Sequence, residues 1–335
     1  MQSSATSFRG FVVAVISLSF AMVSQSATAA TRTWVGGTGN WADGANWSDG
    51  NPPSGANDYG INNDGTAIIN SAVPDVNDLL LGWPTGNSNS GHLELQTGGS
   101  IQTTTSDGIY VGVRSTSTMS TFTVSGGTWT TLGNGHLVIG DEPGSQGTVF
   151  LSSGSMQIAG DMRVGVNGEG NMVIQGSAGS ITVGDDLTFH ESGGARGRLF
   201  VEIDALGISP IKVADDTTLD NQPELDVSLS ALAPLNDLVL IDSTGGAAST
   251  INLGTNFYRL SDSTELPQGA PISATFGLST YNWTIDYAYG ADSNDIALVF
   301  VSVETVPEPG TATLGAFGLL ALGCVARRWR RPIGG

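Results

Sequence analysis

The chain has 335 residues, with 12 Lys or Arg against 31 Asp or Glu and a formal net charge of −19 at pH 7. So acidic a balance excludes nucleic-acid binding, because phosphates require a basic face. The one cysteine, Cys324, excludes a disulfide framework and a thiolate metal site. The 47 glycines, many Ser, Thr and Asn residues and a single lysine suit short strands joined by tight turns and give little support to helices.

Residues 1–29 have the organisation of a secretory signal peptide. Arg9 supplies the positive charge, residues 11–23 form the apolar segment, and Ala27 and Ala29 form the small-residue cleavage site. We expect export by the secretory pathway and a mature chain that begins near Ala30. The exported part is then more acidic still than the whole chain, since five of the 12 basic residues lie in the signal peptide and the C-terminal tail.

Residues 30–90 are predicted to form an N-terminal cap and the first coils of a repetitive β-structure. They contain three tryptophans separated by turns rich in Gly, Asn and Asp: Trp34, Trp41 and Trp47. The first coil of a stacked β-structure exposes apolar side chains and strand edges, which large aromatics and the following Pro52 and Pro53 can cover. The alternative is a platform on which the three indoles stack against sugars. The first strands are expected at Ala67–Ile69 and around Leu79–Leu81.

Residues 91–242 contain a repeat of short alternating strands. Four copies stand out: Gly91–Gly112, Ser120–Gly140, Gly147–Gly165 and Gly170–His190. Their closing positions are 28, 25 and 25 residues apart, and a nearly fixed period in the twenties indicates a solenoid. Within each copy, apolar residues alternate with polar ones, which places one face of each strand in the core. Residues 196–242 continue the pattern less regularly.

The repeat predicts an all-β fold, a single-stranded parallel β-helix with aromatic-rich caps. One copy cannot bury its own apolar face, but stacked copies can, with strands about 4.8 Å apart. A β-sandwich is the alternative, because regularly spaced short strands also suit that architecture.

The opening and closing segments of the exported part resemble bacterial β-solenoid surface proteins, including autotransporter-like passengers. The opening residues read WVGGTGNW from Trp34. Residues 243–305 are a predicted C-terminal β cap, in which Tyr289, Gly290, Asn294 and Asp295 match the closing motif of these proteins. The closing order resembles autotransporter-associated β-strand repeat proteins. The resemblance, with the length of the coils, implies a right-handed helix. Aromatic residues of the closing segment are expected to cover the end of the solenoid: Tyr281, Trp283, Tyr287 and Tyr289.

Few residues indicate chemistry. None of the three histidines, His92, His136 and His190, has a second histidine at metal-ligand spacing, and we interpret His190 as a turn residue. Three aspartates lie in the Gly-Asp turns of consecutive copies, with arginines nearby: Asp161, Asp185 and Asp186, with Arg163, Arg196 and Arg198. They suit turn formation, and the alternatives are a calcium site or a polysaccharide-cleaving site. We expect no catalytic residue, no metal and no cofactor.

Residues 306–331 form a tail with three parts in a fixed order. A Pro307-Glu308-Pro309 turn precedes an apolar run over 311–326, and four arginines follow: Arg327, Arg328, Arg330 and Arg331. A run of about 17 residues can span a bilayer, and the arginines would stay on the cytoplasmic side. The order resembles the PEP-CTERM sorting signal of Gram-negative bacteria, which implies recognition and removal of the tail by an exosortase. The alternative is a membrane anchor that is never cut.

Together these features predict an exported, non-catalytic β-solenoid with a structural or adhesive role. Its expected partners are an exosortase-type enzyme, the inner membrane transiently through the tail, and exopolysaccharide. The expected destination is the cell surface or extracellular matrix of a Gram-negative bacterium. The alternative is a polysaccharide-binding protein or a polysaccharide lyase or hydrolase built on the same fold.

Overall fold

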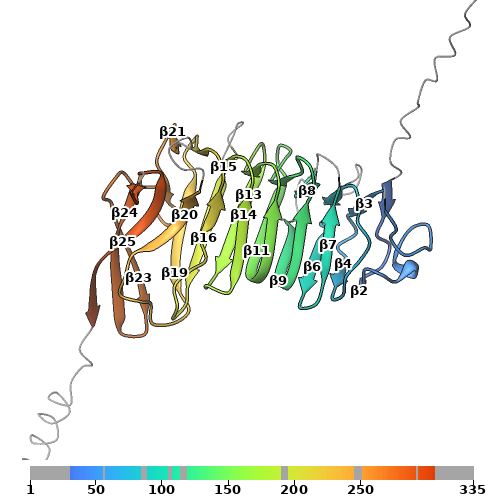
Figure 1. Ribbon diagram of the computed structural model, residues 1–335, viewed down its shortest axis with the longest axis horizontal. Helices are drawn as coiled ribbons and strands as arrows, with labels where there is room; N and C mark the ends of the chain where they lie inside the picture. The colour runs from blue at the N-terminus through green and yellow to red at the C-terminus, as the bar shows by residue number, and fades with distance from the viewer. Residues whose placement is uncertain are drawn as a thin grey trace, which may run out of the picture.

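The computed structural model describes residues 31–55, 57–83, 89–104, 108–113, 119–189, 195–244, 251–291 and 293–305. The chain winds around one long axis, from the blue N-terminal coil at one end to the orange and red strands at the other (Figure 1). Successive coils pair in parallel register, which confirms the predicted parallel β-helix and excludes the β-sandwich. Each coil contributes to three faces.

The first face begins each coil and is built from parallel strands. It contains β2 (Thr38–Asn40), β4 (Thr66–Ile69), β6 (His92–Gln96), the first halves of β9 (Met119–Thr131) and β11 (Gln146–Ile158), β13 (Glu169–Gln175), β16 (Gly197–Ile203), β19 (Glu224–Leu229) and β22 (Tyr258–Arg259).

The second face follows around a corner that β9 and β11 turn without a break. It contains β7 (Ser100–Thr103), the second halves of β9 and β11, β14 (Gly179–Val183), β17 (Ile211–Val213) and β20 (Leu238–Ser243). The two long strands therefore join the first two faces into one sheet.

The third face is a separate nine-stranded parallel sheet. It contains β1 (Thr31–Thr33), β3 (Asp58–Ile61), β5 (Leu79–Leu81), β8 (Gly108–Val111), β10 (His136–Ile139), β12 (Met162–Val164), β15 (Leu187–Phe189), β18 (Thr217–Leu219) and β21 (Ile251–Leu253). The strand ladders thus begin at Thr31, well before the first strand expected at Ala67. The first two strands have three residues each and no buried side chain, which leaves too little alternation to be recognised in the sequence.

The core is filled by columns of like residues, one from each coil. On the third face, five apolar side chains follow one another in register, all at most 1% exposed: Leu81, Val111, Ile139, Val164 and Phe189. The period-two alternation therefore identified the inward positions. Val166 would continue the alternation of Met162 and Val164, but it lies beyond the end of β12 and is only half-buried.

Glycines occupy the corner between the third and first faces. Gly140 and Gly165 close their coils with φ of 74° and 84°, a conformation that disfavours residues with a Cβ. Gly147 opens the coil that follows Gly140, and an added Cβ there would lie 2.1 Å from the carbonyl oxygen of Val111 at the end of β8. The repeated glycines of the sequence therefore mark both turns and close backbone approaches.

Three tryptophans and a tyrosine close the N-terminal end. Trp34, Trp41 and Trp47 are 1%, 0% and 2% exposed, and the ring of Trp47 meets those of Trp34 and Trp41 edge-on at 5.1 and 4.7 Å. The Trp47 ring also meets Tyr59 at 4.9 Å, and its Nε1 donates to the Trp41 carbonyl oxygen at 2.8 Å. A short 3-10 helix, η1 (Gly44–Asn46), lies between the second and third tryptophans. The predicted aromatic cap is present.

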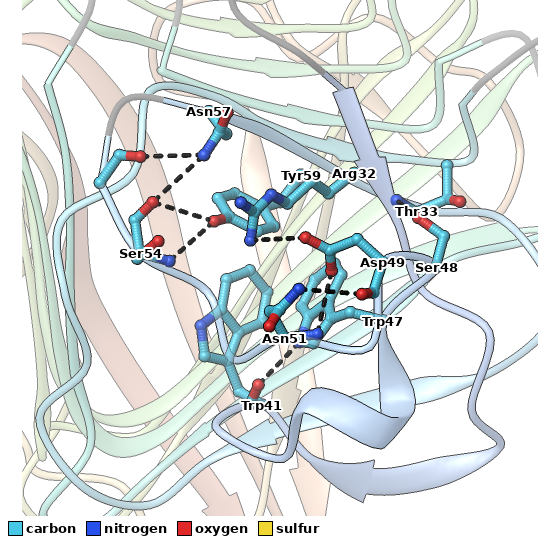
Figure 2. A network of polar contacts seen from close by, with 11 residues as sticks. Arg32, Thr33, Trp41, Trp47, Ser48, Asp49, Asn51, Ser54, Asn57 and Tyr59 are labelled. Carbon is cyan, nitrogen blue, oxygen red and sulfur yellow. Dashed lines mark hydrogen bonds and ion pairs between the residues drawn. The ribbon is translucent and has the colours of Figure 1, made fainter.

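Polar contacts hold the loops over this aromatic cluster, as Figure 2 shows. Arg32 pairs with Asp49 at 3.0 Å, and its guanidinium lies 5.9 Å from the centroid of the Tyr59 ring. The Tyr59 hydroxyl accepts a hydrogen bond from the Ser54 amide at 2.9 Å. These contacts tie the loop before β3 to strands β1 and β3.

An antiparallel sheet closes the C-terminal end. β25 (Asp295–Thr305) pairs antiparallel with β20, and β24 (Ser279–Tyr289) and β23 (Pro271–Phe276) continue outward from it. Tyr281, Trp283 and Tyr287 are buried there as expected. Tyr289 is only half-buried, because its hydroxyl reaches outward to Asp237 at 3.0 Å. The reversal of strand direction ends the parallel stacking and covers the last coil.

Candidate functional site

A shallow hollow of about 380 Å³ runs across the outer surface of the first face, and we call it the outer groove. Its floor is an outward column of three half-buried apolar side chains, Phe150, Val173 and Phe200, paired in register on β11, β13 and β16. The two phenylalanines lie two strands apart, or about 9.6 Å. The column ends at Asp226 on β19. The outer groove therefore presents aromatic rings on a face that is otherwise polar.

Polar side chains line both sides of the outer groove. On one side, Asn171 Nδ2 donates to Thr148 Oγ1 at 3.0 Å, and Arg198 lies next in the same column. The other side has Glu202, whose Oε2 accepts a hydrogen bond from Gln175 Nε2 at 3.1 Å. Apolar rings flanked by amides, hydroxyls and carboxylates form a mixed surface that can contact both the faces and the hydroxyl groups of a sugar.

Sequence reasoning missed the outer groove, although the sequence carries its signal. In three consecutive coils the alternation is broken by three adjacent apolar residues, Val149–Leu151, Met172–Ile174 and Leu199–Val201. The outer two residues of each triplet fit the core positions of the period-two alternation, so the middle residue must point outward. Only the register shows that the three middle residues lie side by side.

The predicted aspartates do come together, at the corner between the second and third faces. Carboxylate oxygens of Asp161, Asp185 and Asp186 lie within 4.8 Å of one another, and Asp186 forms a second such group with Asp215 and Asp216. Burial, followed by the charges of Asp161, Asp186 and Asp215, raises the pKa of Asp185. The corner is thus a ladder of crowded carboxylates.

Hydrogen bonds made by aspartates at this corner indicate that they stabilise turns. Asp186 Oδ1 accepts from the Asp216 amide of the next coil at 3.0 Å, and Asp78 Oδ1 accepts from Gly108 in the same way at 3.1 Å. Asp161 accepts from Arg163 at 2.8 Å. Carboxylate oxygens are ligands that Ca²⁺ prefers, but each group supplies three donor residues where Ca²⁺ takes six to eight oxygens.

The other two arginines expected near the aspartates lie elsewhere. Arg196 and Arg198 both pair with the buried Glu224 at the start of the first face, the Arg198 Nε lying 2.6 Å from Glu224 Oε2. Arg198 also lies 3.5 Å from Glu169. The pair of arginines and the aspartate ladder therefore belong to different corners of the coil, and sequence proximity misplaced them.

Two histidines lie in structural hydrogen bonds. The ring of His92 lies between Thr121 Oγ1 and Ser90 Oγ, at 2.8 and 2.9 Å, and burial lowers its pKa, with Asp64 opposing. His136 accepts from the Asp161 amide at 2.9 Å. His190 lies outside the described residues.

The alternative interpretation, in which the three tryptophans form a platform for sugars, is wrong. Rings that are at most 2% exposed cannot stack against a ligand, because they stack against one another. Burial of Trp34, Trp41 and Trp47 assigns them to the cap.

The sorting and cleavage residues lie outside the described residues. They are Ala27, Ala29, Pro307, Glu308, Pro309, Arg327, Arg328, Arg330 and Arg331. Within the described ranges, which end at Thr305, no helix is both long and apolar enough to cross a membrane.

Comparison with protein families matches residues 305–331 to the PEP-CTERM protein-sorting motif. Comparisons with curated proteins and with solved structures gave no match. A PEP-CTERM motif marks an exported protein with a membrane-associated C-terminal tail that an exosortase-type enzyme processes. The chain is thus a β-solenoid that carries a PEP-CTERM sorting signal directly after its last strand.

Proposed function

We propose that this protein is a non-catalytic structural or adhesive element of the cell surface or extracellular matrix. The supporting observation is the position of the sorting motif, which begins at Thr305, the last residue of β25. Removal of the tail would release a complete solenoid with both ends closed, by the tryptophan cap and by β23–β25. Such a rod suits a role that depends on shape and surface.

The carboxylates support a non-catalytic role. Glycoside cleavage uses two carboxyl groups on either side of a bound sugar, about 5–9.5 Å apart. In the described part of the chain, Asp161, Asp185 and Asp186 instead crowd within 4.8 Å at a corner, where Asp186 bonds the backbone of the next coil. That arrangement suits a turn better than a bound substrate.

The test is incubation of the protein with a panel of acidic and neutral polysaccharides. We expect no change in chain length and no new reducing or unsaturated ends after prolonged incubation. Release of oligosaccharides from any member of the panel, abolished by Asp185→Asn but not by Asp49→Asn in the cap, would replace this proposal with an enzymatic one.

A second candidate function is polysaccharide binding in the outer groove, and the column Phe150, Val173, Phe200 favours it. Aromatic rings two strands apart can stack against two separate sugars of one extended chain, while the flanking Asn171 and Glu202 can contact its hydroxyl groups. Because the protein is acidic, a neutral polysaccharide suits this surface better than an acidic one.

Phe200→Ala tests this second candidate. Loss of one stacking ring should weaken binding to a neutral polysaccharide at least fivefold, measured by affinity electrophoresis. Leu206→Ala is the matched control, since Leu206 is an 84% exposed apolar residue outside the groove. Equal retardation of the wild-type, Phe200→Ala and Leu206→Ala proteins would exclude the outer groove as a sugar site.

A further inference from the structure

The terminal sheet carries an exposed apolar surface at its tip. Phe276, Leu278, Val301 and Val303 are 38%, 49%, 57% and 37% exposed. Phe276 and Leu278 lie at the turn between β23 and β24, and Val303 pairs with Tyr281 across from that turn. Val301 lies two residues before, at an irregularity in the β24–β25 pairing. We call these four residues the tip patch.

The sequence around the tip patch is uncharged. Residues 271–284 and 296–303 contain no Asp, Glu, Lys or Arg, in a chain with 31 acidic residues. Exposed apolar patches framed by polar residues typically mark interaction sites. Here the frame consists of neutral Ser, Thr and Asn side chains, with Glu304 beside it.

The tip patch lies at the point where the chain leaves the solenoid for the sorting tail. β25 ends at Thr305, at the end of the molecule opposite the N-terminal cap (Figure 1). The apolar run of the tail begins at Thr311, six residues on. Six residues span at most about 21 Å, so a tail held in a bilayer keeps the tip close to the lipid surface.

We propose that the tip patch rests on the surface of the membrane that holds the tail before the tail is removed. Four partly exposed apolar side chains can enter the boundary between headgroups and acyl chains, as the apolar face of an interfacial segment does. The acidic body is repelled by anionic lipids, and the uncharged tip is the part that this repulsion affects least. The contact would hold the Pro307-Glu308-Pro309 segment at the membrane surface, where an exosortase in the bilayer can reach it.

This inference rests on the membrane-associated tail of the proposed function, and one experiment separates the two. The chain from Ala30 to its C-terminus, without the signal peptide, is reconstituted into phosphatidylethanolamine and phosphatidylglycerol vesicles after Cys324→Ser, which removes its one cysteine. A bimane label is then placed singly through Leu278→Cys, Val301→Cys or the control Leu206→Cys. Flotation of the vesicles reports insertion of the tail, and quenching by brominated lipids reports contact of the label with the bilayer.

We expect the labels at positions 278 and 301 to be quenched at least twofold more than the label at 206. The added substitution Val303→Asp should reduce quenching at position 278 by half or more while flotation stays unchanged. Protein that floats without quenching at 278 and 301 would overturn the inference and leave the proposed function intact. Bimane emission that shifts as the protein density rises, without quenching by the lipids, would indicate that a second copy covers the tip patch. That result would overturn the inference as well. Protein that does not float contradicts the proposed function, and with it this inference.

Discussion

Trp47 is the residue on which the N-terminal cap depends most. Its ring contacts Trp34, Trp41 and Tyr59, and its indole nitrogen bonds the Trp41 backbone. Trp47→Ala should lower the free energy of unfolding by about 3–5 kcal/mol, the usual cost of removing a buried Trp or Phe side chain. Urea unfolding followed by circular dichroism measures this loss. A change as small as that of the exposed control Leu206→Ala would show that the cap does not depend on the ring.

Asp185 should make stability depend on pH. Its pKa is raised above the ordinary 3.8, chiefly by burial and then by three neighbouring carboxylates. The folded state therefore binds this proton more tightly than the unfolded state, and stability falls as pH rises from 3.8 through the raised folded pKa. The loss of folding stability is fully present at neutral pH and is absent at a pH below both the unfolded and the folded pKa.

Asp185→Asn removes that penalty, so the variant should melt at a higher temperature than the wild type at neutral pH. At a pH below 3.8 the two melting temperatures should agree. Thermal melts at the two pH values make the comparison, with Asp49→Asn as a control outside the ladder. If the variant melts at a lower temperature than the wild type at neutral pH, the ionised Asp185 stabilises the folded state, contrary to this prediction.

At the scale of elements, the corner glycines control how closely one coil stacks on the next. An added Cβ at Gly147 would lie 2.1 Å from the Val111 carbonyl oxygen at the end of β8. Gly147→Ala should cost about 1–3 kcal/mol, as overpacking usually does, because the backbone must move. Gly37→Ala is the matched control, since no atom lies within 4 Å of its added Cβ.

The stabilities of the two glycine variants are compared by their melting temperatures and by the midpoints of their urea unfolding curves. The control should stay within about 0.5 kcal/mol of the wild type. Equal stabilities for Gly147→Ala and Gly37→Ala would mean that the corner can open without cost, contrary to the close stacking of the coils.

The elements also show what a single sequence can predict. Alternation identified inward residues such as Phe122, Val149 and Met172 because side-chain direction is a local property of a strand. The coil offsets followed from repeated turn glycines. By contrast, the neighbours of Phe150 in the outer groove are set by register between coils, and the pairing of Arg196 with Glu224 is set by where two corners meet. Neither is encoded within one copy of the repeat.

At the scale of the whole molecule, both ends of the solenoid are closed and the sorting signal follows the second closure. A stack of parallel strands exposes unpaired edges at its ends, which invite further pairing. The tryptophan cluster packs over the core at one end, and at the other end β25 pairs antiparallel with the edge strand β20. The body is therefore complete at Thr305, and the tail from 306 can be removed without loss of any described strand.

Removal of the tail is the central claim, and intact mass tests it most directly. The full-length protein is expressed in matched hosts with and without an exosortase, beside a control variant that carries Pro307→Ala and Glu308→Ala. With the enzyme, the wild-type product should leave the membrane fraction with a mass that corresponds to a chain ending close to Pro307, while the variant keeps its tail. Uncut, membrane-bound wild-type protein of the same mass in both hosts would contradict the account and indicate a permanent anchor.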